Sequence, residues 1–564
     1  MAAHITLLRD ADTVRGAVDY RGHPVLRSSS GGWRSARFII GLEVAERFAY
    51  YGISSNLITY LTGQLGQSVA AAAENANIWS GLSMLLTLLG ALLADSFFGR
   101  YRTIVFASAL YVLGLGLITL SESLSTATSG CQNSTETTSC STPQLHKVFF
   151  FVSLYLVAVG QGGHKPCVQA FGADQFDGED PEECRAKSSF FNWWYFGLCG
   201  GSFVTISVVI YVQENLSWSL GFGIPCAAMV IAFLVFVLGT RTYRYSITQR
   251  GKNPFLRIGR VFVAAIRNRR TPPPPIKIEE NGNTIVSSQQ FKFLNKACFV
   301  PNDWNHGRTA CTKDEVEEAK AILRVIPIWI TTLVFAVVLA QTGTFFTKQG
   351  ATIDRSVMSG FTVPAASLQS VELLVSVVFV SIYDLLFVPM VRALTRNPIG
   401  ITKLQRIGVG MVFSASSMVI AALVEIKRLT TAGQHGLVDL PEITIPMSFW
   451  WLAPQYALLG VANVFTVVGL QEFFYEEVPK DLKSMGLALY ASLFGMGGLV
   501  SSFLVSVIDK ATKIDGQDGW FANNLNKAHL DYFYFLLGGL NLLGFLGFLY
   551  SSKYYIYSSR SATN

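Results

Sequence analysis

Long apolar runs dominate this sequence. About twelve of them approach the roughly 20 residues that an α-helix needs to span the hydrocarbon core of a bilayer. The first six runs lie near 37–62, 76–95, 100–121, 146–170, 189–213 and 219–240. The second six lie near 318–342, 363–391, 403–427, 446–474, 484–508 and 530–551. Because a helix satisfies its own backbone hydrogen bonds in lipid, this pattern predicts an all-α membrane protein.

The composition agrees with this prediction. Only 14% of the residues are charged, against roughly 25% in soluble domains, and 51% are hydrophobic. Disorder, collagen-like repeats, a coiled coil and a nucleic-acid-binding domain all fit such a composition poorly. The expected partner is therefore the lipid bilayer and not nucleic acid.

A long polar segment separates the two sets of runs and contains consecutive prolines from Pro272 to Pro275. The sequence is therefore expected to form two six-helix halves joined by a linker. The expected divisions are an N-terminal tail, an N-terminal bundle, the linker, a C-terminal bundle and a second tail, at 1–36, 37–240, 241–317, 318–551 and 552–564. Residues 1–36 lack the apolar core of a secretory signal, so the first spanning helix is expected to direct insertion.

Lys and Arg are unevenly distributed among the loops. The stretch 241–278 is rich in both and has no Asp or Glu, whereas 63–75 and 122–145 contain no Lys or Arg. Basic loops stay on the cytoplasmic side, so both termini are expected to be cytoplasmic. Basic and apolar residues interleave at 250–270, which fits either an amphipathic helix on the inner leaflet or a solvated linker.

One loop on the opposite side has features of an oxidising compartment. Cys131 and Cys140 flank a polar stretch that contains the sequon Asn133-Ser134-Thr135. The loop could carry a disulfide and a glycan on Asn133, or it could carry two free thiols.

Ionisable residues inside spanning helices are costly, and each is a functional candidate. Glu43, Glu46 and Arg47 lie in the first run at spacing i, i+3 and i+4, which places them on one helical face. Tyr50 and Tyr51 continue that face. Two carboxylates around one guanidinium are neutral overall only if a proton is taken up, so the cluster is a candidate proton switch. A static ion-pair cluster that sets helix packing is the alternative.

A lysine, Lys165, lies in the fourth run, between several glycines and Pro166. Its ammonium group needs an anionic partner, and Glu472, at the end of the tenth run, is the expected one across the two halves. The neighbouring His164 is interpreted as a packing or polar-lining residue. For Glu372, in the eighth run, a local hydrogen bond and a coupling role both remain open.

The sequence has no P-loop and no nucleophile elbow. Cys298, His306 and Cys311 share a loop without zinc-ligand spacing, so no metal site is predicted. An enzyme is not expected, and no cofactor is expected beyond the proton as coupling ion.

Four motifs resemble those of the plant nitrate/peptide transporter family, which belongs to the proton-dependent oligopeptide transporters of the major facilitator superfamily. The segment from Glu43 to Arg47 is similar to the family's ExxER motif. Three further matches are the fourth-helix signature, the start of the fifth helix and the general superfamily motif, at 160–177, 191–195 and 95–100. The resemblance extends over about 35–550 and implies the twelve-helix fold of the superfamily, in two six-helix halves.

This resemblance also implies roles for single residues. Glu43, Glu46 and Arg47 would couple transport to protons, and Lys165 and Glu472 would form a salt bridge between the halves. Gln341 matches a pocket position of the seventh helix. Leu339 stands where the family's nitrate-binding members have a histidine, which weakens the case for nitrate. Thr103 matches a threonine that is phosphorylated in some members, although an ordinary helix-start residue is the preferred interpretation.

The expected function is proton-coupled symport of a small anionic or zwitterionic solute, such as a di- or tripeptide, nitrate or a related plant metabolite. The expected substrate-binding residues are Tyr50, Tyr51, Lys165, Gln341 and Glu472. The protein is expected to act as a monomer in the plasma membrane or the vacuolar membrane. A membrane sensor for which transport is secondary is the alternative function.

Overall fold

The computed structural model describes residues 13–129, 144–177, 180–246, 254–269, 291–298, 311–358, 361–383, 390, 401–478, 483–513 and 519–555. Each of the predicted apolar runs contains at least one helix. The N-terminal half consists of α2 (Gly32–Ser54), α3 (Leu57–Gly63), α4 (Val69–Leu93), α5 (Arg100–Ser129), α6 (Gln144–Ala173), α7 (Pro181–Val204), α8 (Ile210–Asn215) and α9 (Trp218–Leu238). The π-helical turns η1 (Ala94–Phe98) and η2 (Thr205–Val209) adjoin α4 and α7.

The C-terminal half repeats this plan. It contains α12 (Lys313–Leu339), α13 (Phe345–Ala351), η5 (Ala365–Leu368), α14 (Gln369–Ile382), α16 (Lys403–Gln434), η7 (Phe449–Leu452), α17 (Ala453–Glu476), α18 (Lys483–Thr512) and α19 (Leu530–Lys553). Its first helix, α12, begins with a capping box. The Thr312 hydroxyl accepts a hydrogen bond from the Glu315 amide, and the Glu315 carboxylate accepts one from the Thr312 amide. This local signal sets where the linker ends and the second bundle begins.

Nine helices within the described ranges are long and apolar enough to span a membrane. The other predicted runs correspond to α2, α6 and α14, of which α2 carries the charged cluster from Glu43 to Arg47. The predicted all-α membrane fold with two helical halves is confirmed.

Short strands, which the sequence did not predict, lie at both ends of the bundle. At one end, β1 (Thr13–Val18) pairs with β2 (Pro24–Leu26) and with β3 (Tyr245–Ser246) in the order β2-β1-β3. At the other end, β4 (Ile353–Asp354) pairs with β7 (Ile445–Ser448), and β5 (Ser356–Met358) pairs with β6 (Phe361–Thr362).

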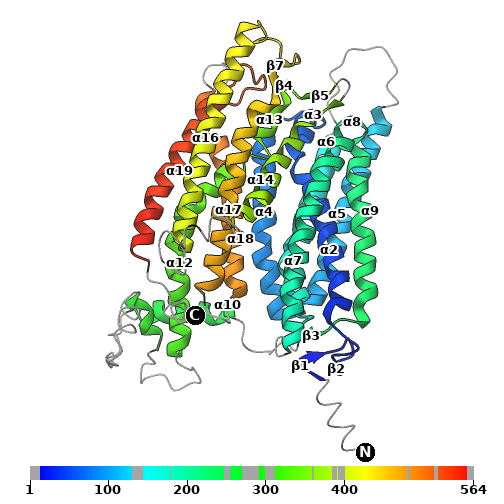
Figure 1. Cartoon of the computed structure of the whole chain (residues 1–564), viewed down its shortest axis with the longest axis vertical. Helices are drawn as coiled ribbons and strands as arrows, with labels where there is room; N and C mark the ends of the chain where they lie inside the picture. The colour runs from blue at the N-terminus through cyan, green and yellow to red at the C-terminus, as the bar shows by residue number, and fades with distance from the viewer. Residues whose placement is uncertain are drawn as a thin grey trace, which may run out of the picture.

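The two halves stand side by side in Figure 1, and the helices of each run along the long axis of the molecule. The linker helix α10 (Pro254–Arg267) and the sheet β2-β1-β3 lie at the lower end, which we call the linker end. The strands β4, β5 and β7 lie at the upper end, which we call the far end.

The linker segment 250–270 contains the predicted amphipathic helix as α10, but the surroundings of this helix differ from the expectation. Its apolar residues Ile258, Val261 and Ala265 are buried against η4 (Lys292–Cys298) and α12. Arg257 forms a 2.7 Å ion pair with Glu318 of α12. The buried face of α10 therefore packs on the second bundle instead of lying on lipid.

Glycines allow the helices to pack closely, as the sequence around Lys165 indicated. A Cβ atom at Gly90 of α4 would lie 2.1 Å from the Gly162 carbonyl oxygen of α6. Between the halves, a Cβ atom at Gly81 of α4 would lie 2.7 Å from the Gly495 carbonyl oxygen of α18. Small residues at such crossings bring helix backbones together in membranes.

Candidate functional site

Glu43, Glu46 and Arg47 form the cluster that their spacing predicted. Arg47 Nε lies 3.2 Å from Glu43 Oε1 and 3.3 Å from Glu46 Oε2. The two carboxylates are almost completely buried, and Glu46 is 0% exposed. A helix that starts at the linker end carries this ion cluster into the span of the membrane.

Of the four carboxylate oxygens in this cluster, Glu43 Oε1 accepts hydrogen bonds from Arg47, and the other three accept none within the described residues. Glu43 Oε2 and both oxygens of Glu46 have no hydrogen-bond partner in the part of the chain that the structure describes. A carboxylate oxygen with no donor can accept a further hydrogen bond or carry a proton. The geometry therefore leaves room on the carboxylates for a proton.

Lys165 of α6 lies beside this cluster and is close enough to Glu46 and Glu43 to interact with both electrostatically. Its Nζ atom lies 3.2 Å from Met84 Sδ and 5.8 Å from the centre of the Tyr50 ring. No carboxylate of the described residues lies within salt-bridge distance of Nζ. The ammonium group is thus held by a thioether and an aromatic face, and it remains able to bind an anion.

Tyr50 and Tyr51 extend the site toward the other half. The Tyr50 ring stacks on Trp79 of α4, with ring centres 5.8 Å apart, and its hydroxyl lies 3.4 Å from Ser80 Oγ. The Tyr51 ring contacts the Tyr50 ring edge to face, at 5.4 Å. Tyr51 also packs on a buried cluster that includes Ala366 of the C-terminal half. That the two tyrosines bind substrate stays a prediction.

A carboxylate from the C-terminal half lies opposite. Glu372 of α14 accepts a 2.6 Å hydrogen bond from Asn463 Nδ2 of α17. The structure shows no cation beside this carboxylate among the described residues. The sequence left the role of Glu372 open, and it gave no indication of the Asn463 partner.

Glu372 lies at the depth of the tyrosines. Gln369, one turn earlier in α14, donates a 3.0 Å hydrogen bond from Nε2 to the Ser55 carbonyl oxygen across the halves. Tyr51 lies one turn before Ser55, and α2 and α14 run in opposite directions along the bundle. Glu372 therefore lies at the level of Tyr51, close enough for an electrostatic interaction with its hydroxyl.

Glu472 does not pair with Lys165 in this structure. Its carboxylate is 41% exposed near the linker end of α17, and its Oε2 atom lies 3.6 Å from Arg406 Nη1 of the same half. Glu472 follows Asn463 by nine residues, which corresponds to about 180° around a helix at roughly 3.6 residues per turn. Because Asn463 faces α14, Glu472 lies on the opposite side of α17. The predicted Lys165–Glu472 bridge is absent from this conformation for that reason.

Gln341 lies between the halves but is not free to bind a ligand. Its side chain is fully buried, and Nε2 donates hydrogen bonds to the Val337 carbonyl oxygen and to Ser501 Oγ, at 2.8 and 2.9 Å. Asn77 of α4 donates to the same hydroxyl at 3.0 Å. Gln341 therefore belongs to a cross-half hydrogen-bond network here. Leu339, at the family's histidine position, packs against the apolar core.

The remaining candidates from the sequence are His164, Thr103 and the residues of the predicted disulfide and glycosylation site. His164 is buried with no hydrogen bond among the described residues, and Thr103 Oγ1 donates a 3.0 Å bond to the Gly99 carbonyl oxygen. Cys131, Asn133 and Cys140 lie outside the described residues. No cluster with the composition of a metal site occurs within the described ranges.

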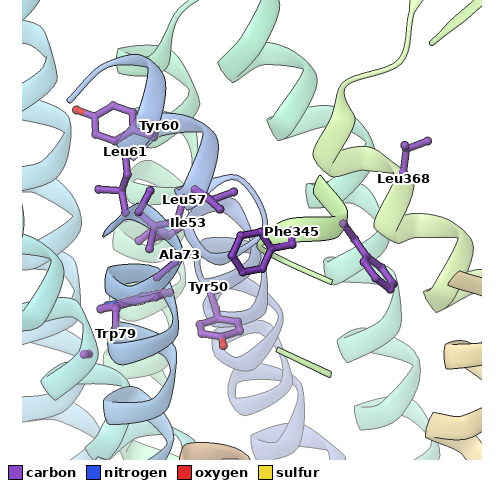
Figure 2. Close-up of a cluster of buried hydrophobic side chains, with 14 of the residues drawn as sticks. Tyr50, Ile53, Leu57, Tyr60, Leu61, Ala73, Trp79, Phe345 and Leu368 are labelled. Atoms are coloured by element: carbon purple, nitrogen blue, oxygen red, sulfur yellow. The ribbon is translucent and has the colours of Figure 1, made fainter. Parts of the chain in front are cut away.

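Contacts between the halves close the far end. Ser367 Oγ donates a 2.6 Å hydrogen bond to the Ile206 carbonyl oxygen, and Lys348 of α13 hydrogen-bonds Thr62 of α3. Phe345 of α13 belongs to the same buried apolar cluster as Leu57 and Tyr50 of the N-terminal half, and Figure 2 shows part of this cluster. Polar bonds and apolar packing thus seal the site from this end.

Comparisons with known proteins identify the family of this chain. The model of the POT family matches residues 101–521. The chain is 59% identical over 542 residues to the Arabidopsis thaliana protein NRT1/PTR FAMILY 5.10 and 56% identical over 547 residues to NRT1/PTR FAMILY 5.14. These alignments cover 96% of the chain in both cases, and 96% and 97% of the relatives.

Solved structures show the same fold. An auto-inhibited POT family peptide transporter superposes with a TM-score of 0.70 at 22% identity, covering 93% of this chain and 98% of the other. The POT family transporter PepTSo gives a TM-score of 0.69 at 20% identity, with the same coverage. The predicted transporter fold in two helical halves is confirmed, and the chain belongs to the POT family, a family of integral membrane transporters.

Proposed function

We propose that this protein is a proton-coupled symporter that moves a small anionic or zwitterionic solute by alternating access of the two halves. The observation that carries the proposal is the buried cluster on α2. Arg47 pairs there with Glu43 and Glu46, three of whose carboxylate oxygens have no hydrogen-bond donor within the described residues, and the ammonium group of Lys165 lies beside them. The described residues offer no comparable reason to favour a sensor.

The proton would bind at Glu43 or Glu46. With both carboxylates ionised, Arg47 and the nearby Lys165 balance their two negative charges. Protonation of one carboxylate removes a negative charge and leaves a net positive charge in the site. That excess favours an anionic group of the substrate near Lys165, so proton binding and substrate binding support one another.

Substrate would bind between Lys165 and Tyr50 on one wall and Glu372 and Asn463 on the other. We propose Glu372 in place of Glu472 as the carboxylate that the C-terminal half contributes. Glu372 lies at the depth of Tyr51 and has no cation beside it, whereas Glu472 lies near the linker end beside Arg406. In a state with the linker end closed, Lys165 and Glu372 would approach one another across the two tyrosines.

The sidedness follows from the basic loops. The linker end carries the basic segment 241–278, so we place this end and both termini in the cytoplasm. The far end then faces outward, and the present structure, sealed at the far end, corresponds to the inward-facing side of the cycle. We propose that the protein acts as a monomer, without a cofactor, in the plasma membrane or the vacuolar membrane.

The substrate class is supported by the relatives. Solved members of the fold are described as peptide transporters, and the related plant proteins bear the NRT1/PTR name. Leu339 provides no imidazole for nitrate, whereas Lys165 and Glu372 present opposite charges to a zwitterion. We therefore place zwitterionic solutes before nitrate among the candidates.

The test is uptake by purified protein in vesicles under an imposed pH gradient, with a panel of dipeptides, nitrate and plant glycosides. The proposal predicts accumulation of at least one class that stops when the gradient is collapsed. Wild-type uptake in both Glu46→Gln and Lys165→Ala would overturn the mechanism.

A further inference from the structure

A groove runs along the outer face of α2 near the linker end. Its first part, of about 690 Å³, lies between α2 and α7 and is lined by Trp33, Arg37, Ile40, Gly41, Trp193, Phe196 and Gly197. Its second part, of about 440 Å³, lies between α2 and α9 and is lined by Gly41, Val44, Ala45, Phe48, Ala228, Ile231, Ala232 and Val235. Gly41 lines both parts, so the two parts adjoin at this glycine.

The two parts differ in chemistry. Arg37 brings a cation to the first part, whereas the second part is lined only by apolar side chains and a glycine. The first part lies beside the first turns of α2, at the linker end, and the second part extends toward the middle of the span. A phospholipid has the same order of chemistry, with a charged headgroup at the interface and acyl chains toward the membrane centre.

Three other arginines at this end of the N-terminal half pair with carboxylates. Arg27 pairs with Asp177 at 2.6 Å, Arg100 with Asp174 at 2.5 Å and Arg244 with Glu183 at 2.6 Å. Arg37 is exposed, and the structure gives it no carboxylate partner within the described residues. An exposed guanidinium on a membrane-facing surface is complementary to a phosphate group.

Aromatic rings form the walls of the first part. Trp33 contacts Phe176 edge to face at 6.0 Å, and Trp193 contacts Phe196 edge to face at 5.7 Å. Tryptophan is enriched at the level of lipid headgroups, where its ring is partly apolar and partly polar. The floor is open, because a Cβ atom on Gly41 would meet no atom within 4 Å.

We propose that this groove is a binding site for one anionic phospholipid of the inner leaflet, with its phosphate on Arg37 and one acyl chain along Gly41, Val44 and Phe48. The assignment to the inner leaflet rests on the sidedness proposed above. The lipid would occupy the face of α2 opposite the face on which Glu43, Glu46 and Arg47 lie. The lipid would therefore stabilise the helix that binds the proton.

The test is native mass spectrometry of the purified full-length protein with phosphatidylglycerol and with phosphatidylcholine of the same acyl chains. The proposal predicts preferential retention of phosphatidylglycerol. Arg37→Gln is expected to weaken that retention about fivefold, the effect of one basic residue at an anionic membrane surface. Gly41→Leu, which fills the groove, is expected to reduce retention of the lipid in this site.

Two variants serve as matched controls. Arg34→Gln removes an exposed arginine of the same helix that does not line the groove, and Gly539→Leu fills open space on an exposed face of α19. Both should retain phosphatidylglycerol as the wild type does. Equal retention of the two lipids, or full retention by Arg37→Gln and Gly41→Leu, would overturn the proposal. Because the readout is binding, it is independent of whether the protein transports.

Discussion

Glu372 accepts a 2.6 Å hydrogen bond from Asn463, and this pair places a carboxylate of the C-terminal half at the depth of Tyr51 in the N-terminal half. The carboxylate is joined to a neutral amide and not to a cation. It can therefore respond to charges that arrive in the site, whether from a substrate or from Lys165 as the halves move. In this respect Glu372 differs from Glu472, which already lies beside Arg406.

Glu372→Gln is expected to reduce transport of a zwitterionic substrate by about tenfold or more, since a hydrogen bond or contact to a charged group contributes roughly 1.5–3 kcal/mol. Initial uptake rates in vesicles, normalised to the amount of protein, measure this. The exchanged pair Lys165→Glu with Glu372→Lys should recover more activity than either single variant if the two charges meet during the cycle. No recovery, together with wild-type uptake in Glu372→Gln, would refute the assignment.

Glu472→Gln is expected to leave uptake within about twofold of the wild type. Its carboxylate is 41% exposed, so water screens its 3.6 Å ion pair with Arg406. The same vesicle assay measures it beside Glu372→Gln. A loss of transport larger than that of Glu372→Gln would restore Glu472 as the partner of Lys165.

Arg428→Met is expected to destabilise the C-terminal half without touching the transport site. Arg428 and Glu425 of α16 are 0% exposed and pair at 2.6 Å, and Arg428 also donates to the Leu525 carbonyl oxygen at 2.7 Å. Removal of one partner of a buried pair costs about 3–5 kcal/mol, because the other charge stays buried. Thermal inactivation in detergent should be faster than for Lys513→Met, in which the exposed Lys513 loses its pair with Asp509. Equal rates would contradict this role.

The sequence predicted those parts of the molecule that depend on local patterns. The spanning helices follow from apolar length, and the cluster of Glu43, Glu46 and Arg47 follows from i, i+3 and i+4 spacing, which fixes geometry within one helix. Both predictions agree with the structure.

The contacts across helices could not be predicted in the same way. Lys165 needed an anionic partner, and Glu472 is the one acidic residue of the tenth run. Which side of α17 Glu472 occupies depends on how that helix is rotated in the bundle. Asn463 and Ser501 carry no charge, so nothing in one sequence distinguished them from ordinary polar residues. The nine-residue separation of Asn463 and Glu472 shows only that the two face opposite sides of α17. The hydrogen bond from Asn463 to Glu372 in the structure shows which of these sides is the inner one.

The central claim is that protonation of the α2 cluster couples the pH gradient to substrate movement. The most direct measurement compares gradient-driven accumulation with substrate exchange at equal pH, in vesicles that contain wild-type protein or Glu46→Gln. The account predicts that Glu46→Gln loses accumulation but retains exchange. The glutamine side chain at this position stays neutral, and the halves still move. Gradient-driven accumulation by Glu46→Gln at the wild-type level would contradict the account.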